Sequence, residues 1–420
     1  MDLLELINAV VFTLSQIIHV LIFVIGCYFF SISIFGWIIK KEDDAGYYPP
    51  KTKFAVVIPA HNEEAVIAHI IDSLFMQNYP RELYDVFVIA DNCTDRTAEI
   101  AEKQGAKVFI RQNKNERGKG YALEWMFNKI YNMQENYDAI AVFDADNLVS
   151  SNFLCEMNKQ LLKGYKVVQG YIDSKNPFDS WITCSYSIAF WLSNRIYQLP
   201  RYNLGLSCNL CGTGFCVSLE VLRKIGWGAT CLTEDLEFTM KLALNDIKIG
   251  WAHNAVVYDE KPITLRQSWK QRIRWMQGHA DCASRYLIPL FKKAFKESSL
   301  ISFDCAIYLF QPLRFILLGL ATIFIWIQAI YPKSPFFSLQ YVFPVTVWQV
   351  YITLQSLYGP LVILAEKKFK PAVIFGFLVF PIYCLTWVPI AIQGFLSKNN
   401  KNWHHTIHTR KISIKDLEKA

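Results

Sequence analysis

The sequence predicts an α/β domain built on a doubly wound sheet and flanked by transmembrane α-helices. Two observations predict this fold. Between about residues 51 and 270, short apolar runs alternate with segments of helical periodicity, and on both sides lie long stretches almost without charge. Alternating strands and helices are typical of doubly wound sheets, and a spanning helix needs about 20 apolar residues. The 420 residues are enough for one large domain and several membrane helices.

The N-terminal segment, residues 1–40, is predicted to be a membrane anchor. It is almost uncharged up to Ile39, and it lacks the basic start and the small-residue cleavage site of a secretion signal. Lys40 and Lys41 end the stretch, and basic residues beside a span favour the cytoplasmic side. We therefore expect a multi-pass protein of the cell membrane with its central domain, residues 51–281, in the cytoplasm.

The central domain is predicted to alternate strands with helices, because its short apolar runs are bounded by turn residues. Strands are expected at Phe54–Pro59, Val86–Ala90, Lys107–Ile110, Ala139–Phe143 and Lys166–Tyr171. Helices are expected at Val66–Met76, Arg96–Gln104, Gly120–Met133, Trp181–Leu199, Glu234–Asn245 and Ser268–His279. Polar clusters follow the first, second and fourth strands. Ligands of such sheets bind beyond the carboxyl ends of the strands, so these clusters predict one site.

Residues 282–300 predict an amphipathic helix lying in the membrane interface, with a surface helix of the domain as the alternative. The C-terminal region, residues 301–397, contains candidate spans at about 307–331, 343–365 and 372–396. The basic residues before the last span and the basic tail, 398–420, both favour the cytoplasm, which a single crossing does not allow. Either the last segment is re-entrant or interfacial, or another segment is doubled.

Composition excludes several other classes of protein. A net charge of +7 is ordinary for a membrane protein with cytoplasmic loops and gives no indication of nucleic-acid binding. The eleven cysteines are scattered without regular spacing, which argues against a disulfide framework. Cys208 and Cys211 form a C-x-x-C, but a zinc site shared with His404, His405 and His408 would join segments far apart in the chain, so we do not expect one.

Asp144-x-Asp146 predicts a metal site. Alternate residues at a strand end share a face, and two carboxylates there provide the hard oxygen ligands that Mg²⁺ or Mn²⁺ prefers. Such a pair is weak evidence in a solvated loop. Here it follows the apolar run Ala139–Phe143, and charges at the end of a buried strand need a reason.

Two further motifs suit sugar transfer. Thr233-Glu-Asp235 lies at a predicted helix start, where the helix dipole favours ionised carboxylates. One ionised carboxylate beside a sugar-diphosphate donor permits an inverting transferase. Gln271, Arg274 and Trp275 share one face of a helix, so that a guanidinium can bind a diphosphate and an indole can stack on a sugar. The sequence around Lys119 lacks the spacing of a P-loop, which excludes an NTPase of that kind.

These motifs, in this order and between membrane helices, resemble the processive family 2 glycosyltransferases, which include cellulose, mixed-linkage glucan, hyaluronan, chitin and poly-N-acetylglucosamine synthases. The resemblance covers about residues 55 to 279 and implies a GT-A-type fold. It implies a catalytic base at Asp235 and a metal site at Asp144 and Asp146. The implied nucleotide-sugar contacts are Pro59, His61, Glu63, Asp91, Lys119, Asp144, Gln271 and Arg274, and the implied acceptor contacts are Cys211, Gly212, Thr213, Glu234 and Trp275.

The resemblance further implies a UDP-sugar donor, UDP-glucose being favoured, and a growing polysaccharide acceptor that leaves through the membrane helices. N-acetylglucosamine or hyaluronan-type polymers remain alternatives, as does a single transfer to a lipid-linked acceptor. A transporter with a cytoplasmic domain would need functional charges within its spans. Asp304 and Arg314 are the only candidates and both lie near an end, so a transporter is disfavoured.

Overall fold

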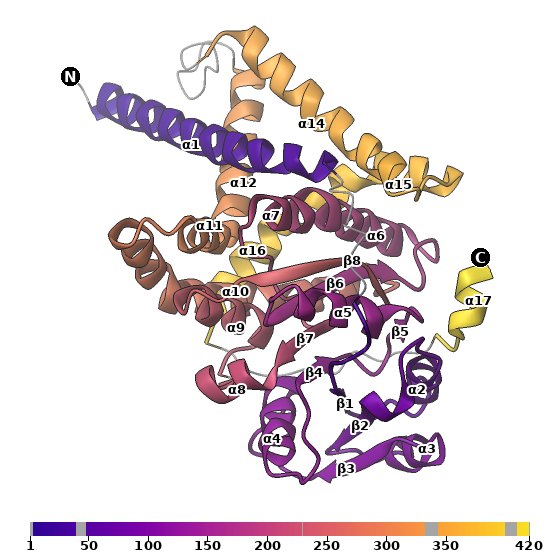
Figure 1. Ribbon diagram of the computed structural model, residues 1–420. Coiled ribbons are helices and arrows are strands. Elements are labelled where there is room, and N and C mark those ends of the chain that lie inside the picture. Colours follow the sequence, from indigo (N-terminus) through magenta and orange to yellow (C-terminus); the bar gives the residue numbers. More distant parts are fainter. Residues whose placement is uncertain (1–2, 39–47, 229, 332–342, 400–409, 420) are drawn as a thin grey trace.

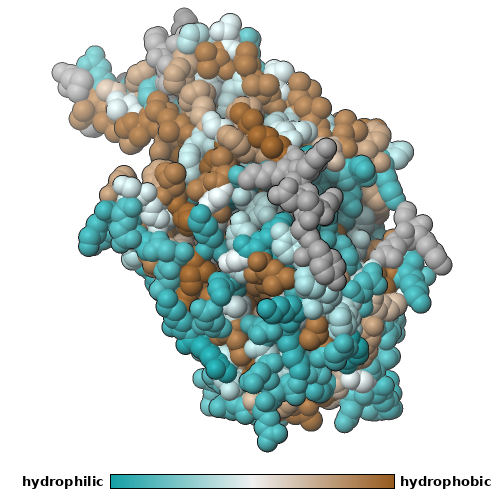
Figure 2. Space-filling model, viewed as in Figure 1, coloured by the Kyte–Doolittle hydropathy of each residue, from teal (hydrophilic) through white to brown (hydrophobic). Residues whose placement is uncertain are grey.

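A computed structural model describes residues 3–38, 48–228, 230–331, 343–399 and 410–419. An α/β domain lies on one side of a group of long helices, which occupy the upper part of Figure 1. The surface of that upper part is mostly apolar and the surface of the domain is mostly polar (Figure 2). The molecule is therefore divided into a part suited to lipid and a part suited to water.

In the part of the chain that the structure describes, eight strands form one mixed sheet in the order β3-β2-β1-β4-β7-β6-β8-β5. Their bounds are β1 Phe54–Ala60, β2 Tyr84–Asp91, β3 Lys107–Arg111, β4 Ala139–Val142, β5 Leu148–Val149, β6 Val167–Ser174, β7 Phe215–Ser218 and β8 Ile249–Asp259. Strands β1 to β4 are parallel, whereas β7 is antiparallel to both of its neighbours. The expected α/β sheet is confirmed, and its second half also contains antiparallel pairs, which involve β7 and β5.

Helices cover both faces of the sheet. Those of the domain are α2 Ile67–Phe75, α3 Thr97–Lys103, α4 Lys119–Tyr131, α5 Phe153–Leu162, α6 Trp181–Ser193, α7 Leu199–Leu204, α8 Leu219–Ile225, α9 Glu234–Leu244 and α10 Leu265–Lys296. Strand β1 shows why its residues are apolar without alternation. Ala55 and Val57 pack into one core cluster, and Phe54, Val56 and Ile58 pack into the cluster on the other face.

The structure corrects three expectations in the second half of the domain. The helix expected to reach Leu199 ends at Ser193 and continues through a π-helical turn into α7. Strands β7 and β8 had not been predicted. The two helices expected within residues 268–299 are one helix, α10, which contains Pro289. The basic amphipathic segment is thus the continuation of the helix that carries Gln271 and Trp275.

Within the described ranges, four helical segments are long and apolar enough to cross a membrane: Glu5–Trp37, Gln311–Ile330, Thr346–Ala365 and Pro371–Leu396. The four segments correspond, in this order, to the following helices. They are α1 Leu3–Ser33 with its 3₁₀ end Ile34–Trp37, α12 Gln311–Ile330, α14 Val345–Ala365, and the pair α15 Pro371–Leu385 and α16 Trp387–Leu396. A short apolar helix, α11 Leu300–Leu309, joins α10 to α12. The helical structure of the last segment is interrupted at Thr386, so this segment consists of two helices, α15 and α16.

Both ends of the α15–α16 pair lie against the α/β domain. Before α15, Glu366 accepts hydrogen bonds from Arg195 (3.1 Å) and Tyr171 (2.9 Å). After α16, the Gln277 side chain donates to the Ser397 hydroxyl (2.9 Å). Helix α15 also packs along α6. The pair therefore begins and ends on the same side of the molecule.

The C-terminal segment returns to the domain. Helix α17, Ile414–Lys419, lies beside α2 (Figure 1). The backbone N–H of Arg410 donates to the carboxylate of Glu260 (3.2 Å). The basic pair Lys40 and Lys41 and the three histidines of the disfavoured zinc site lie outside the described residues.

Candidate active site

Asp144 and Asp146 follow β4 at the centre of the sheet. The backbone N–H of Asp144 donates to the side-chain oxygens of Asn147 (3.1 Å) and Thr213 (3.0 Å), which fixes the turn. Asp146 is 3% exposed, and one of its carboxylate oxygens accepts the backbone N–H of Glu260 (3.1 Å). The carboxylate of Asp146 is thus buried and held in place, whereas the carboxylate of Asp144 is partly exposed.

The chemistry of this pair fits Mg²⁺ or Mn²⁺. Among the described residues no group of three or more His, Cys, Asp or Glu side chains forms a closed metal site. Mg²⁺ is commonly held by only one or two carboxylates, with phosphate oxygens of the substrate and water completing its shell. The open side of Asp144 leaves room for that arrangement.

Lys119, the first residue of α4, lies between Asp144 and the loop before β7. Its ammonium forms an ion pair with the carboxylate of Asp144 and donates to the carbonyl of Gly212 (2.7 Å). Burial opposes the charge of Lys119, but the carboxylates of Asp144, Glu234 and Asp235 outweigh burial and raise its pKa. Lys119 therefore links the predicted metal ligand to the predicted acceptor loop.

Asp235 and Glu234 begin α9 on the other side of that loop. Gly212 has a φ of +83°, and a Cβ there would lie 3.5 Å from a carboxylate oxygen of Asp235. A glycine thus permits both the left-handed turn and the close approach. Burial raises the pKa of Asp235, and burial together with the charge of Asp235 raises the pKa of Glu234 to about 7. These carboxyls hold protons more tightly than exposed ones.

A residue that the sequence analysis missed holds the acceptor loop. The fully buried side chain of Gln169, in β6, accepts the backbone N–H of Cys211 (3.0 Å) and donates to the carbonyl of Thr213 (2.9 Å). The sequence did contain a sign of this role, because Gln169 is a polar residue inside the predicted strand Lys166–Tyr171. A buried amide without hydrogen bonds would destabilise the fold, so this glutamine required polar partners, and the structure shows that they are backbone groups of the loop.

Four of the predicted nucleotide-sugar contacts, Pro59, His61, Glu63 and Asp91, lie near the ends of β1 and β2. The His61 ring donates to the carbonyl of Asp91 (2.7 Å), and the backbone N–H of Glu63 donates to the Thr97 hydroxyl (2.8 Å). The carboxylate of Asp91 forms a buried ion pair with Arg111 (2.7 Å). Arg111, at the end of β3, had not been singled out. Pro59 lies in β1 beside Ile89 of β2.

The motif on α10 faces the membrane helices as well as the site. Gln271 accepts a hydrogen bond from the Tyr186 hydroxyl (3.0 Å). Trp275 is partly exposed, and its ring stacks on Trp387 of α16 (centroids 6.4 Å apart, 19° between planes). Arg274 is partly exposed, and its positive charge lowers the pKa of Glu234 against the larger effect of burial. This motif therefore lies between α9, the helix that carries Asp235, and the α15–α16 pair.

Arg272, also missed, has no exposed surface and lies among aromatic rings. Its guanidinium lies 4.4 Å from the ring centre of Tyr383 and 4.9 Å from that of Trp387, and it donates to the Thr386 hydroxyl (2.8 Å). Cation–π contacts stabilise such a group when it is removed from water. Arg272 thus fastens the joint between α15 and α16 to α10.

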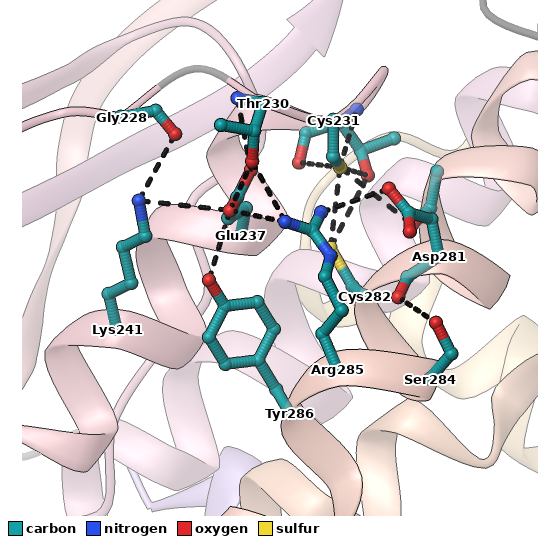
Figure 3. A network of polar contacts seen from close by, with 12 residues as sticks. Gly228, Thr230, Cys231, Glu237, Lys241, Asp281, Cys282, Ser284, Arg285 and Tyr286 are labelled. Carbon is teal, nitrogen blue, oxygen red and sulfur yellow. Dashed lines mark hydrogen bonds and ion pairs between the residues drawn. The ribbon is translucent and has the colours of Figure 1, made fainter.

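A polar network fixes the start of α9 (Figure 3). Glu237, 1% exposed, accepts hydrogen bonds from the hydroxyl of Thr230 (2.7 Å), from Arg285 (2.9 Å) and from the hydroxyl of Tyr286 (2.9 Å). The donors come from the loop before α9 and from α10. The network therefore holds both in place around the helix end that carries Asp235.

A sheet of this topology, with paired carboxylates at one strand end and a carboxylate at a facing helix start, defines a glycosyltransferase of the GT-A class. The family described as glycosyltransferase-like family 2 matches residues 49–278, over half of the chain. The chain belongs to this family.

Three curated relatives illustrate the similarity. A probable glycosyltransferase YdaM of Bacillus subtilis is 27% identical over 267 residues, 61% of this chain and 62% of the relative. A β-monoglucosyldiacylglycerol synthase of Nostoc is 31% identical over 237 residues, 53% and 48% of the two chains. A poly-β-1,6-N-acetyl-D-glucosamine synthase of Staphylococcus epidermidis is 26% identical over 245 residues, 56% and 57%. The chain thus spans about half to three fifths of the length of these relatives.

Among solved structures, a mannosyltransferase of Pyrobaculum calidifontis, in complex with GDP-mannose and Mn²⁺, is similar over nearly the whole molecule. The TM-score is 0.61 and the identity 15%, and the match covers 93% of this chain and 99% of that one. At this identity the likeness supports the fold alone.

Proposed function

We propose that the chain is an inverting, metal-dependent transferase that moves a sugar from a UDP-sugar to a hydroxyl group of a membrane lipid. The observation that carries this proposal is the position of Asp235. It faces the loop at Gly212, and Asn209 of the same loop donates to the hydroxyl of Tyr197, whose ring packs on Tyr308 of the apolar helix α11. A hydroxyl presented to Asp235 from that direction comes from the membrane.

The proposed topology has three crossings. Helices α1, α12 and α14 span the bilayer, and α15–α16 enters and leaves on the side of the α/β domain. The contacts of Glu366 and Ser397 with the domain support this topology, because they place both ends of the pair on one side. The basic segment Glu366–Lys370 then lies in the cytoplasm with the domain, as the distribution of basic residues favours. With this topology the basic residues before α15 and the basic tail after α16 both lie in the cytoplasm, which a single crossing by the last segment does not allow.

On the donor side, Asp144 and Asp146 would hold Mg²⁺ or Mn²⁺. When bound, the ion takes up negative charge on the leaving diphosphate. Pro59, His61, Glu63 and Asp91 line the proposed place of the uridine. Two cations of the chain support the diphosphate: Lys119, beside the carboxylate of Asp144, and Arg274 on α10. Gln271 belongs to the same proposed site.

On the acceptor side, Asp235 removes the proton from the attacking hydroxyl. The bond from the sugar C1 to the diphosphate breaks as the bond to the lipid oxygen forms on the opposite face, so an α-linked donor gives a β-linked product. The raised pKa of Asp235 suits a base that must accept a proton. Cys211, Gly212, Thr213, Glu234 and Trp275 form the proposed acceptor wall.

The number of crossing helices favours a lipid acceptor over an exported polymer. Helix α1 packs against both α12 and α14, and packed helices have axes about 8–10 Å apart, so these three helices leave little room for a sugar chain between them. A lipid can reach the site from the side, and a relative named for a glucosyldiacylglycerol product is 31% identical.

Polymer synthesis stays a second candidate, with UDP-glucose or UDP-N-acetylglucosamine as donor. The partly exposed Trp275 favours it, because an indole face can stack on the terminal sugar of a chain. UDP-glucose is the proposed donor in both cases.

The test is transfer from radiolabelled UDP-glucose and UDP-N-acetylglucosamine by the purified full chain in lipid nanodiscs. A chloroform-soluble, β-glucosidase-sensitive product that carries one sugar supports the proposal. Ethanol-insoluble polymer, digestible by glucanase or chitinase, would replace it with the second candidate. No transfer from either donor, with Mg²⁺ or Mn²⁺ present, would contradict both.

A further inference from the structure

Two cysteine thiols of the α/β domain are in contact beside the start of α9. The sulfur of Cys231, in the loop before α9, points toward that of Cys282, in α10, and the two sulfur atoms lie 3.4 Å apart without being bonded (Figure 3). Cys231 is partly exposed, whereas Cys282 has no exposed surface. One thiol is thus accessible to a small molecule from solvent, and its neighbour is shielded.

The surroundings of the two thiols suit oxidation that starts at Cys231. The hydrogen bond that Cys282 makes with Cys231, together with burial, raises the pKa of Cys282, so this thiol keeps its proton. The guanidinium of Arg285, which pairs with Glu237 and Asp281, also lies within electrostatic range of both sulfurs. Reactive cysteines are typically partly exposed and close to a positive charge. We therefore expect an oxidant to meet Cys231 first.

The position of Cys231 is tied to the first residues of α9. Thr233 is the N-cap of this helix, and the sulfur of Cys231 accepts its backbone N–H (3.3 Å) and lies 3.3 Å from its hydroxyl oxygen. On its other side Thr233 presses against α10, since a Cβ at Gly278 would lie 2.4 Å from the Thr233 hydroxyl oxygen. Thr233 therefore has no room to move closer to α10. Asp235 follows two residues later, so a change in this loop reaches the proposed base.

We propose that Cys231 and Cys282 form a reversible disulfide when the protein meets hydrogen peroxide, and that this bond lowers the rate of sugar transfer. Peroxide oxidises the Cys231 thiol to a sulfenic acid and is reduced to water. The Cys282 thiol then attacks the sulfenic sulfur, its proton leaves with the hydroxyl group as a second water, and the sulfur–sulfur bond forms. Two thiols thus lose two electrons, and one peroxide becomes two waters. Disulfides in a reducing compartment are commonly transient and redox-sensing.

The effect on transfer depends on which sulfur moves. Cys282 is fully buried within the long helix α10, whereas Cys231 lies in a loop. A disulfide is shorter than any non-bonded contact, so bond formation draws Cys231 toward α10 and weakens its contacts with Thr233. The end of α9 that carries Asp235 then loses its fixed position, while the strand ends of the donor side keep theirs. The bond itself is independent of the proposed function, but its effect on transfer rests on that function.

The experiment treats the purified full chain in lipid nanodiscs with hydrogen peroxide, blocks the remaining thiols and identifies linked peptides by mass spectrometry. We expect a peptide pair joined through Cys231 and Cys282, retained binding of UDP, and recovery of transfer with dithiothreitol. Transfer from UDP-glucose should fall roughly tenfold or more in the oxidised protein, because a small misplacement of a catalytic group has effects of at least that size.

Cys231→Ser should keep its rate of transfer in peroxide, and Cys282→Ala serves as a second variant if the first does not fold. Cys155→Ser is the matched control and should stay sensitive to peroxide, because Cys155 is a partly exposed thiol of α5 that hydrogen-bonds to the carbonyl of Asn78.

Two results would overturn the inference directly: no linked pair after oxidation, or a linked pair with undiminished transfer. An equal loss of transfer in Cys231→Ser would assign the sensitivity to another thiol and overturn it as well. If the reduced protein transfers sugar to no acceptor, the proposed function fails, and the linked peptides alone then decide whether the bond forms.

Discussion

The donor and acceptor sides of the site are built differently. Most of the proposed donor groups follow β1, β2 and β4, which are neighbouring parallel strands formed within residues 54–142. Trp275, a proposed acceptor group, instead stacks on Trp387 of α16, and α16 is held against α10 by a contact between segments far apart, Gln277 with Ser397, 120 residues away. We therefore expect donor binding to depend on the α/β domain, and acceptor binding to depend also on how the apolar helices dock against that domain.

The largest effect should come from the donor side, through Asp146. Replacing Asp146 by Asn removes a charged metal ligand, so we expect transfer and donor hydrolysis to fall together, by roughly a thousandfold or more. Chelation of divalent ions should do the same to the unsubstituted chain, with recovery on adding Mn²⁺. The measurement is UDP release and product formation in parallel. Full activity in excess chelator would contradict the metal site.

The next effect separates the base from the donor site. Asp235→Asn keeps the shape of the side chain but cannot accept the proton, so transfer should fall by about 10²–10⁴ while UDP binding is retained. Isothermal titration with UDP and Mn²⁺ provides the binding control. Retained turnover would place the base on another residue.

A smaller effect concerns pH. Burial raises the pKa of Asp235, and burial and the neighbouring Asp235 raise the pKa of Glu234 to about 7. A base with a raised pKa takes up its proton at a higher pH than an exposed carboxylate does, so transfer should decline as the pH falls through the raised pKa of Asp235. Glu234→Gln removes a negative charge beside Asp235 and should move the acid limb to lower pH. The limb is measured as kcat/KM against pH. An unchanged limb would show that these carboxyls titrate independently.

The smallest expected effect is the most selective for the acceptor side. Trp275→Ala should lower transfer roughly tenfold and leave donor hydrolysis near its original rate, because the ring contributes to the acceptor wall and stacks on α16. Trp269→Ala, a tryptophan of the same helix that donates to Gln393 of α16 (3.0 Å), is the control for a general loosening of the pair. Equal loss in both assays would indicate that Trp275 acts through stability.

The first strands of the sheet and the polar clusters at their ends could be predicted from the sequence because each part is local. An apolar run marks a strand buried on both faces, and the polar residues directly after it mark the strand end. The pairing of Asp91 with Arg111 could not be predicted in the same way, since it depends on β3 lying beside β2. Gln169 was visible as a polar residue in an apolar strand, but its partners in the acceptor loop were not.

The second half of the domain was harder to predict for physical reasons. Strand β8 contains the polar residues His253 and Asn254 beside Trp251, so its sequence lacks the continuous apolar run by which the other strands were predicted. Its pairing with β6 also shifts in register between Gly170 and Tyr171. Helix α10 looked like two helices because a polar stretch separates its motif from its lysines. In the structure that stretch packs inward, where Arg285 meets Glu237 and Cys282 is fully buried.

The position of Lys119 bears on the order in which ligands arrive. Its ammonium already neutralises Asp144 and is held by the carbonyl of Gly212. A free divalent ion must compete with this internal cation for the same carboxylate, so it should bind weakly by itself. A nucleotide diphosphate brings new negative charge and offers Lys119 another partner, which releases Asp144. Ion and nucleotide should therefore bind with positive cooperativity, and the ion's apparent affinity should depend on how much nucleotide sugar is present.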